Sequence, residues 1–204
     1  MASDLSVVNT AAEVLAFMEK HRQYVQSEAC LPPPNVGLLR LRLIGEELGE
    51  LCAAVHARDW IEVADALADL EYVVAGTAIA FGLEHRFYAK DGLLPPQVIE
   101  PGLHVLQASL RSLYISFGRF CSAMEMSDLL QCQTTLEDMS ISTQLFANVC
   151  CIPLNRVFRE VHRSNMTKAP LDSNNKGGKV GKEGFQAPQI GAILESVGFT
   201  FGER

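Results

Sequence analysis

The sequence predicts an all-α protein. Apolar side chains recur at intervals of three or four residues through most of the 204-residue chain, and no segment shows the strict apolar–polar alternation of a half-buried strand. Hydrophobic residues make up 48% of the chain, which is enough for one substantial core without disulfides or metal clips. We therefore expect one helical domain over residues 1–204.

The first expected helix runs from about residue 11 to residue 26. It ends before the proline triplet 32–34, because proline cannot continue a helix from its interior. Its apolar stripe consists of Val14, Leu15, Phe17, Met18 and Tyr24.

A helix pair follows, over about 38–57 and 60–81. Asp59 stands in the turn between them as a candidate N-cap, and Gly82 closes the second helix. A loop rich in glycine and proline is expected over about 90–102.

The chain after this loop resembles a degraded copy of that pair. A shift of 69 positions (121 − 52 = 69) aligns identical residues without a gap, although chance matching of two amphipathic helices remains the alternative. We expect repeat 1, over about 38–85, and repeat 2, over about 103–155, to pack into one four-helix bundle. The identical pairs are Leu41/Leu110, Gly49/Gly118, Cys52/Cys121, Ala54/Ala123, Asp59/Asp128, Leu67/Leu136, Asp69/Asp138 and Ala78/Ala147.

Two acidic stretches, in residues 46–50 and 62–69, carry candidate ligands for a cation. At roughly 100° per residue they place carboxylates on one face of each helix, beside apolar residues that require burial. Such carboxylates repel one another and lose solvation unless a cation neutralises them. Because no His or Cys stands at a matching spacing, we expect Mg²⁺, with Mn²⁺ as the alternative. The candidate ligands are Glu46, Glu47, Glu50, Glu62, Asp65 and Asp69.

Two other interpretations of the acidic stretches stay open. Glutamate is a good helix former, and acidic runs often form a solvated helix face. A di-iron bundle is the second alternative, but such a site normally uses Glu-x-x-His on two helices, a spacing that this chain lacks.

Repeat 2 has lost most of the acidic positions. Only Asp69 has a carboxylate counterpart, Asp138, so it is partly a structural residue in this interpretation. We therefore expect one asymmetric site per chain. The positions equivalent to the other five carboxylates hold Ile115, Ser116, Arg119, Gln131 and Thr134.

The tail, over about 156–204, is expected to form a flap over the site. Its segment 172–184 is polar and rich in glycine and lysine, which is also typical of a surface loop, while the apolar residues of 190–197 would anchor it to the bundle. In the functional interpretation, the tail supplies the positive and amide groups that contact the phosphates and base of a nucleotide. The candidates are Arg163, Asn165, Lys168, Lys179 and Lys182.

Charge and hydropathy exclude several classes of partner. A formal charge of −7 argues against binding to a nucleic-acid polymer, which favours a basic surplus. Neither a signal peptide nor an apolar run of membrane-spanning length is recognisable. We expect a cytoplasmic protein that does not associate with membranes.

The acidic and tail motifs together resemble the all-α nucleoside triphosphate pyrophosphohydrolase superfamily. This superfamily includes the MazG-like, phosphoribosyl-ATP pyrophosphohydrolase-like and dimeric all-α dUTPase proteins. The resemblance covers about residues 10–85 and 155–190. It is carried by Glu47-Leu-Gly-Glu50, Glu62-Val-Ala-Asp65, the run Leu70–Thr77, and Glu160-Val-His-Arg-Ser-Asn-Met-Thr-Lys168.

This resemblance implies a MazG-like bundle that uses Mg²⁺ to cleave a nucleoside triphosphate between the α and β phosphates, giving monophosphate and pyrophosphate. By resemblance, Glu47 or Glu50 would orient or deprotonate the attacking water. The motif Glu-x-x-Asp aligns ambiguously, so Glu62, Asp65 and Asp69 all remain candidates. House-cleaning of noncanonical nucleotides is one role that the resemblance implies.

Other functions stay open at this point. The enzyme could be dUTPase-like, which requires a pocket that excludes the thymine methyl group. A non-catalytic, nucleotide-binding regulatory bundle and a purely structural interaction protein are the alternatives outside enzymes. The chain could act alone or as a homodimer.

Overall fold

The computed structural model describes residues 10–84, 100–169 and 184–199. These residues form helices and connecting turns, with no β-strand among them, so the all-α prediction is confirmed. The helices are α1 (Thr10–Lys20), α2 (Pro34–Ala57), α3 (Trp60–Ala80), α4 (Leu103–Glu125), α5 (Leu129–Val149), α6 (Leu154–Met166) and α7 (Ile190–Ser196).

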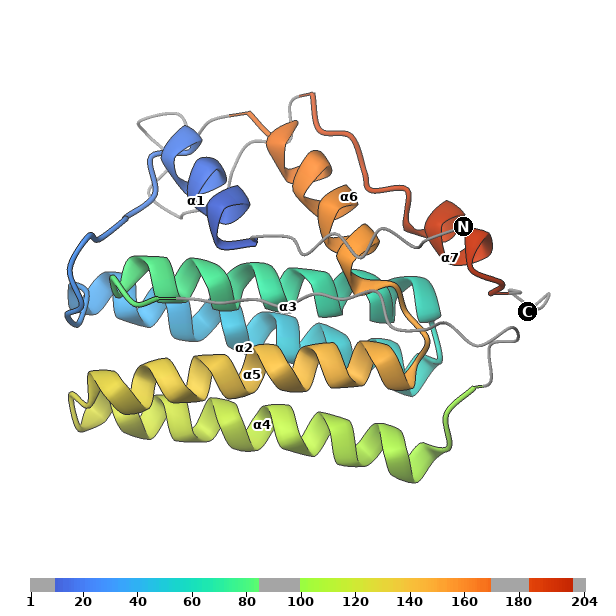
Figure 1. Cartoon of the computed structure of the whole chain (residues 1–204), viewed down its shortest axis with the longest axis horizontal. Helices are drawn as coiled ribbons and strands as arrows, with labels where there is room; N and C mark the ends of the chain where they lie inside the picture. The colour runs from blue at the N-terminus through green and yellow to red at the C-terminus, as the bar shows by residue number, and fades with distance from the viewer. Residues whose placement is uncertain (1–9, 85–99, 170–183, 200–204) are drawn as a thin grey trace, which may run out of the picture.

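Helices α2 to α5 form the expected four-helix bundle (Figure 1). The α2–α3 pair packs on the α4–α5 pair through contacts of α3 with α5 and of α2 with α4. On the opposite side, α1 and α6 pack on α3, and α7 packs on α3 and α6. Ile190 and Leu194 of α7 are buried, as expected for an anchor of the tail.

Helix α3 is the central element of the fold because it contacts α1, α2, α5, α6 and α7. Its sequence suits this position, since many of its buried residues are small and allow neighbouring helices to approach closely. The buried small residues of α3 are Ala64, Ala66, Ala68, Ala75, Gly76, Ala78 and Ala80.

The two helix pairs match in detail at the offset of 69. Helix α4 begins 69 residues after α2 (103 − 34), and α5 both begins and ends 69 residues after α3 (129 − 60 and 149 − 80). The turn residues Arg58 and Ser127 both have φ of 55°. Origin by duplication stays a prediction, but the two pairs share their local geometry.

Equivalent aspartates cap the second helix of each pair. The Asp59 carboxylate accepts a hydrogen bond from the backbone N–H of Glu62 at 3.3 Å, which confirms the predicted N-cap. Asp128 accepts from the backbone N–H of Gln131 at 2.9 Å. Each carboxylate thereby satisfies one of the free N–H groups at a helix start.

Two predicted helix boundaries were wrong. The first helix ends at Lys20 rather than near residue 26, because Arg22 adopts the left-handed conformation (φ 52°) and the backbone N–H of Gln23 turns back to the carbonyl of Met18 at 2.8 Å. Helix α2 begins at Pro34 rather than near residue 38. Proline is well accepted in the first helical turn, where its missing N–H is not needed.

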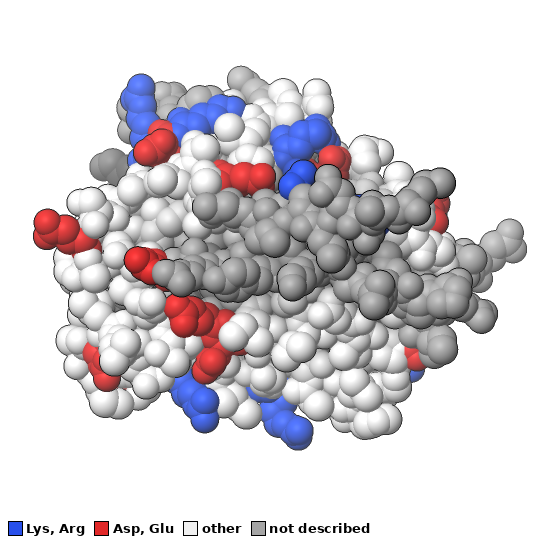
Figure 2. Space-filling view, viewed as in Figure 1, with Lys and Arg blue, Asp and Glu red and all other residues white. Residues whose placement is uncertain are grey.

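None of the described helices is long and apolar enough to cross a membrane. On the face shown in Figure 2, acidic and basic side chains of the described residues are interspersed. The expected loop at 90–102 lies mostly outside the described residues, and a single domain over 1–204 stays a prediction.

Candidate active site

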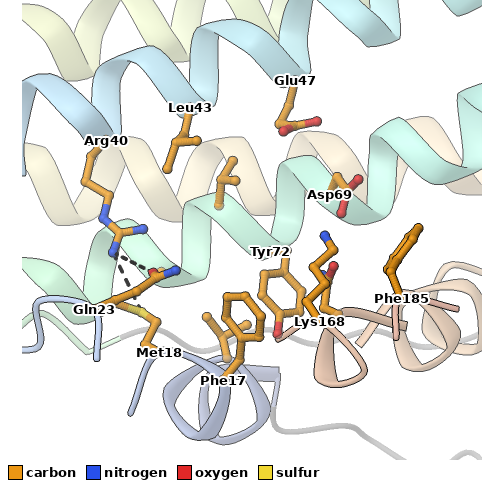
Figure 3. Close-up of a pocket in the computed structure, with 14 residues that line it drawn as sticks. Phe17, Met18, Gln23, Arg40, Leu43, Glu47, Asp69, Tyr72, Lys168 and Phe185 are labelled. Carbon is orange, nitrogen blue, oxygen red and sulfur yellow. Dashed lines mark hydrogen bonds between the residues drawn. The ribbon is translucent and has the colours of Figure 1, made fainter. Parts of the chain in front are cut away.

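A pocket of about 390 Å³ opens between α1, α2, α3 and the end of α6. Its two ends differ in chemistry (Figure 3). Glu47 and Asp69 lie at one end, near Lys168, whereas Arg40 and Gln23 lie at the other end. Aromatic side chains, including Phe17 and Tyr72, line the pocket between them, and pockets of this size commonly hold small molecules.

Glu47 on α2 is the most perturbed carboxylate of this site. Its pKa is raised to about 8, mainly by burial and then, in decreasing order, by the negative charges of Asp69, Glu50, Asp65 and Glu46. Its Oε2 atom is buried and has no hydrogen-bond partner. A cation is the natural way to stabilise the ionised form of such a group.

Two aspartates of α3 face Glu47 and share its environment. Burial, followed by the charge of Asp65, raises the pKa of Asp69 to about 7. Burial, followed by the charge of Glu62, raises the pKa of Asp65 to about 6. The exposed Glu50 contributes to the raised pKa of all three groups. The structure therefore brings Glu47, Asp65 and Asp69 together, with Glu50 and Glu62 at the rim.

Lys168 provides a positive charge beside these carboxylates. It follows the end of α6, where its backbone N–H donates to the carbonyl of Asn165 at 3.1 Å. Its charge lowers the pKa of Asp65 and of Asp69, in opposition to burial. The ammonium group also lies over the ring of Phe185, 5.3 Å from the ring centre. Lys168 can therefore bind an anionic ligand at the carboxylate end.

The wall of the pocket between its ends is largely aromatic. The Tyr72 and Phe17 rings meet edge to face, with their centres 5.4 Å apart. The Tyr72 hydroxyl lies 3.1 Å from Nδ1 of His162, and the side chain of Asn165, only 7% exposed, also hydrogen-bonds to it. Burial raises the pKa of Tyr72, so the hydroxyl stays protonated. Flat, apolar surfaces of this kind suit a heterocyclic ring.

The structure does not bring every predicted site residue to the pocket. Arg163 lies on the exposed side of α6, where it donates to Glu160 at 2.7 Å and to Gln186 at 3.1 Å. Its position differs from that of Asn165 because residues two apart on a helix point to different faces. Glu46 is exposed and pairs with Arg42 at 3.4 Å. Lys179 and Lys182 lie outside the described residues.

Sequence reasoning missed Arg40 and Gln23. A signal for Arg40 was present, since it precedes Leu43 and Glu47 by three and seven residues and so shares their helical face. Gln23 carried no such signal, because its position depends on the early end of α1. Burial lowers the pKa of the Arg40 guanidinium to about 10, so it remains charged at neutral pH.

The donor set fits a hard divalent cation. All candidate ligands offer carboxylate oxygens, which Mg²⁺ and Mn²⁺ prefer, and one oxygen of Glu47 lacks any partner. As they stand, no three His, Cys, Asp or Glu side chains of the described residues converge closely enough to enclose an ion. Rotation about the side-chain torsions of Glu and Asp would be needed to close the site. Metal binding therefore stays a prediction.

The segment that contains this site is similar to a known protein family. The family model for phosphoribosyl-ATP pyrophosphohydrolase matches residues 17–89. Residues 17–89 belong to the all-α nucleoside triphosphate pyrophosphohydrolase (MazG-like) superfamily. The matched segment includes the end of α1 and all of α2 and α3, and thus the candidate carboxylates as well as Arg40 and Gln23.

A second comparison extends beyond this superfamily segment. An uncharacterized protein of Acanthamoeba polyphaga mimivirus is 31% identical over 160 residues, which cover 68% of this chain and 61% of the viral protein. The match therefore spans about three fifths of the relative's length. No solved structure matches the chain. The segment that matches the family model thus contains the end of α1, α2 and α3, while α4 to α7 lie outside it.

Proposed function

We propose that this protein is a Mg²⁺-dependent nucleoside triphosphate pyrophosphohydrolase. It would cleave the substrate between the α and β phosphates and release a nucleoside monophosphate and pyrophosphate. One observation carries the proposal: the Glu47 carboxylate, whose Oε2 atom is buried without a hydrogen-bond partner, lies within the superfamily segment, among carboxylates whose pKa values are raised by burial and mutual repulsion. Such a cluster is ready to bind cations that carry a polyphosphate.

The residues would have different roles according to their positions in the pocket. Glu47, Glu50, Asp65 and Asp69 would hold Mg²⁺, or Mn²⁺, with Glu62 at the rim. The bound ions would neutralise the charge of the triphosphate and polarise the phosphoryl group under attack. Lys168 would bind a phosphate oxygen, since its ammonium group lies beside the same carboxylates. Glu47 or Glu50 would orient the attacking water and accept its proton.

Several finer features of the proposal rest on the sequence. They include house-cleaning of noncanonical nucleotides, cytoplasmic localisation, a homodimer as one oligomeric state, and the absence of binding to nucleic-acid polymers or membranes. Each stays a prediction. The described groups of the proposed site come from α2, α3 and Lys168, which follows α6.

A product analysis tests the reaction. The purified protein is incubated with a panel of canonical, deoxy and modified nucleoside triphosphates, with Mg²⁺ and with chelator. We expect monophosphate and pyrophosphate only in the presence of Mg²⁺, and a loss of roughly 10²–10⁴-fold in turnover for Glu47→Gln. Release of diphosphate and phosphate would place the cleavage elsewhere. Binding of nucleotides without turnover would instead indicate a regulatory bundle.

A further inference from the structure

A buried guanidinium occupies the end of the pocket that the proposed chemistry does not use. Arg40 is only 4% exposed, yet it lines the pocket together with Gln23 and Met18 (Figure 3). The carboxylates that would hold the triphosphate lie at the opposite end. A nucleotide whose phosphates lie at the carboxylate end would therefore extend its base toward Arg40.

The guanidinium has few partners in the protein. Its Nη2 atom donates to the amide oxygen of Gln23 at 3.5 Å and approaches the sulfur of Met18 at 3.8 Å, both long contacts. The Nε atom is buried without any partner. None of the ion pairs found between described residues includes Arg40. A buried cation with unused donors is costly unless a ligand supplies acceptors.

Gln23 reinforces the donor character of this end. Arginine has five N–H donors and no acceptor, so Gln23 must turn its amide oxygen toward Arg40. The amide nitrogen of Gln23 then remains as a further donor. The backbone of Gln23 is held by its hydrogen bond to the carbonyl of Met18 at 2.8 Å, which fixes where the amide can reach.

Helix α3, which faces Arg40 across the pocket, leaves space for the guanidinium. A Cβ atom on Gly76 of α3 would lie 3.1 Å from Nη1 of Arg40 and 3.5 Å from the sulfur of Met18. That distance is tighter than an ordinary van der Waals contact. The missing side chain therefore leaves room for the guanidinium across from α2, beside the aromatic wall formed by Phe17 and Tyr72.

We propose that Arg40, assisted by Gln23, is a specificity-determining residue that selects nucleotides by the base edge opposite the sugar. The donors would favour bases with a carbonyl oxygen there, such as uracil and hypoxanthine. Cytosine and adenine carry an exocyclic amino group at the same position. This group is itself a donor and cannot accept a hydrogen bond from Arg40 or from the amide nitrogen of Gln23. This inference rests on the proposed function, because it assumes that the phosphates bind at the carboxylate end.

Two pairs of substrates that differ only at this edge of the base test the proposal. dUTP and dITP carry a carbonyl oxygen at this edge, beside a protonated ring nitrogen. dCTP and dATP carry an amino group in its place, beside an unprotonated ring nitrogen. We expect kcat/KM of the wild-type enzyme to favour the carbonyl member of each pair by roughly tenfold or more, as a good pair of base hydrogen bonds allows. Arg40→Gln should reduce each ratio to near one, since an amide can donate or accept. Arg40→Lys should retain part of the preference.

A purely structural role for Arg40 predicts a different outcome. Loss of stability would lower kcat/KM for both members of a pair by the same factor and leave their ratio unchanged. Because Arg40 variants could fail to fold, Gln23→Leu provides a second test at a less buried position. It removes the oxygen that orients the guanidinium, and we expect the ratios to fall several-fold. Unchanged ratios in the folded variants would overturn the inference.

A binding measurement separates this inference from the proposed function. Non-hydrolysable α,β-imido analogues of dUTP and dCTP are titrated calorimetrically in the presence of Ca²⁺. Tighter binding of the dUTP analogue, lost in Arg40→Gln, would support base selection even if no triphosphate is hydrolysed. Hydrolysis of all four triphosphates with equal kcat/KM, and equal binding of both analogues, would overturn the inference while leaving the hydrolase intact.

Discussion

At the scale of single residues, the site depends on placing several carboxylates where water is scarce. Glu47 and Asp69 face each other across the α2–α3 pair, and burial raises the pKa of both. Lys168 opposes this effect on Asp69 but not on Glu47. The cluster is therefore only partly neutralised by the described protein residues, and a divalent cation would complete the neutralisation.

A comparison of two basic residues of the tail tests which of them contacts the substrate. Lys168→Met should lower kcat/KM by roughly tenfold or more, because it removes a charged hydrogen bond to a phosphate. Arg163→Met is the matched control, since Arg163 pairs with Glu160 outside the pocket, and its kcat/KM should stay near that of the wild type. Steady-state kinetics at fixed Mg²⁺ measure both. Equal losses in the two variants would contradict the assignment of Lys168.

At the scale of elements, local signals determined how much of the fold could be predicted. The helix beginning at Trp60 was predictable because a capping aspartate and a closing glycine act over a few residues. The end of α1 was not, since nothing in the sequence marks the left-handed conformation of Arg22. Within one tail motif, Asn165 lines the pocket while Arg163 does not, which depends on how α6 packs on α3.

The position of Arg40 in the pocket could likewise not be predicted from the sequence. A lone arginine in an apolar helix stripe normally extends its charged end into water, so the sequence alone does not distinguish it from a pocket residue. Only the tertiary structure shows that its guanidinium is buried, between Gly76 of α3 and the side chains of Met18 and Gln23. The carboxylates, in contrast, were recognisable because several occur together at helical spacing.

The two equivalent N-caps allow a direct test of element-level similarity. Asp59→Ala and Asp128→Ala should each lower the free energy of unfolding by about 1 kcal/mol, because each removes an acceptor from a free helix N–H. Chemical denaturation of the two variants and of the wild type measures this change. Asp59→Asn and Asp128→Asn retain an acceptor and should lose less. No loss in either alanine variant would show that the caps do not contribute.

At the scale of the whole molecule, the two helix pairs share their geometry but differ in their carboxylates. The α4–α5 pair has nearly the same helix bounds and turn geometry as α2–α3, but Ser116 and Thr134 stand where Glu47 and Asp65 would be. Burying the charge cluster in only one pair limits its destabilising effect to one side of the bundle. Stability should then depend on pH and on Mg²⁺ through this cluster.

The sign of the pH dependence follows from the raised pKa values. Glu47, with a pKa raised from 4.5 to about 8, binds more protons in the folded than in the unfolded chain between these values. In chelator, the free energy of unfolding should therefore fall as pH rises from about 6.5 to 8.5. His21 and His162, whose pKa values burial lowers from 6.5, act in the opposite direction mainly below this window.

Thermal unfolding at both ends of this window measures the effect. We expect a Tm lower by a few degrees at the higher pH in chelator, and recovery of most of that loss in Mg²⁺. Glu47→Gln is the control, because it should reduce the pH-dependent loss and raise the Tm in chelator at the higher pH. An unchanged or rising Tm in chelator for the wild type would contradict the described electrostatics.

In the proposed function, catalysis depends on the carboxylates of α2 and α3. The most direct measurement compares turnover of a nucleoside triphosphate by Asp69→Asn and by Asp138→Asn, its equivalent in the other helix pair, with the release of monophosphate and pyrophosphate followed in Mg²⁺. We predict a loss of at least roughly a hundredfold for Asp69→Asn and wild-type turnover for Asp138→Asn. Equal activity in the two variants, with both folded, would contradict the account.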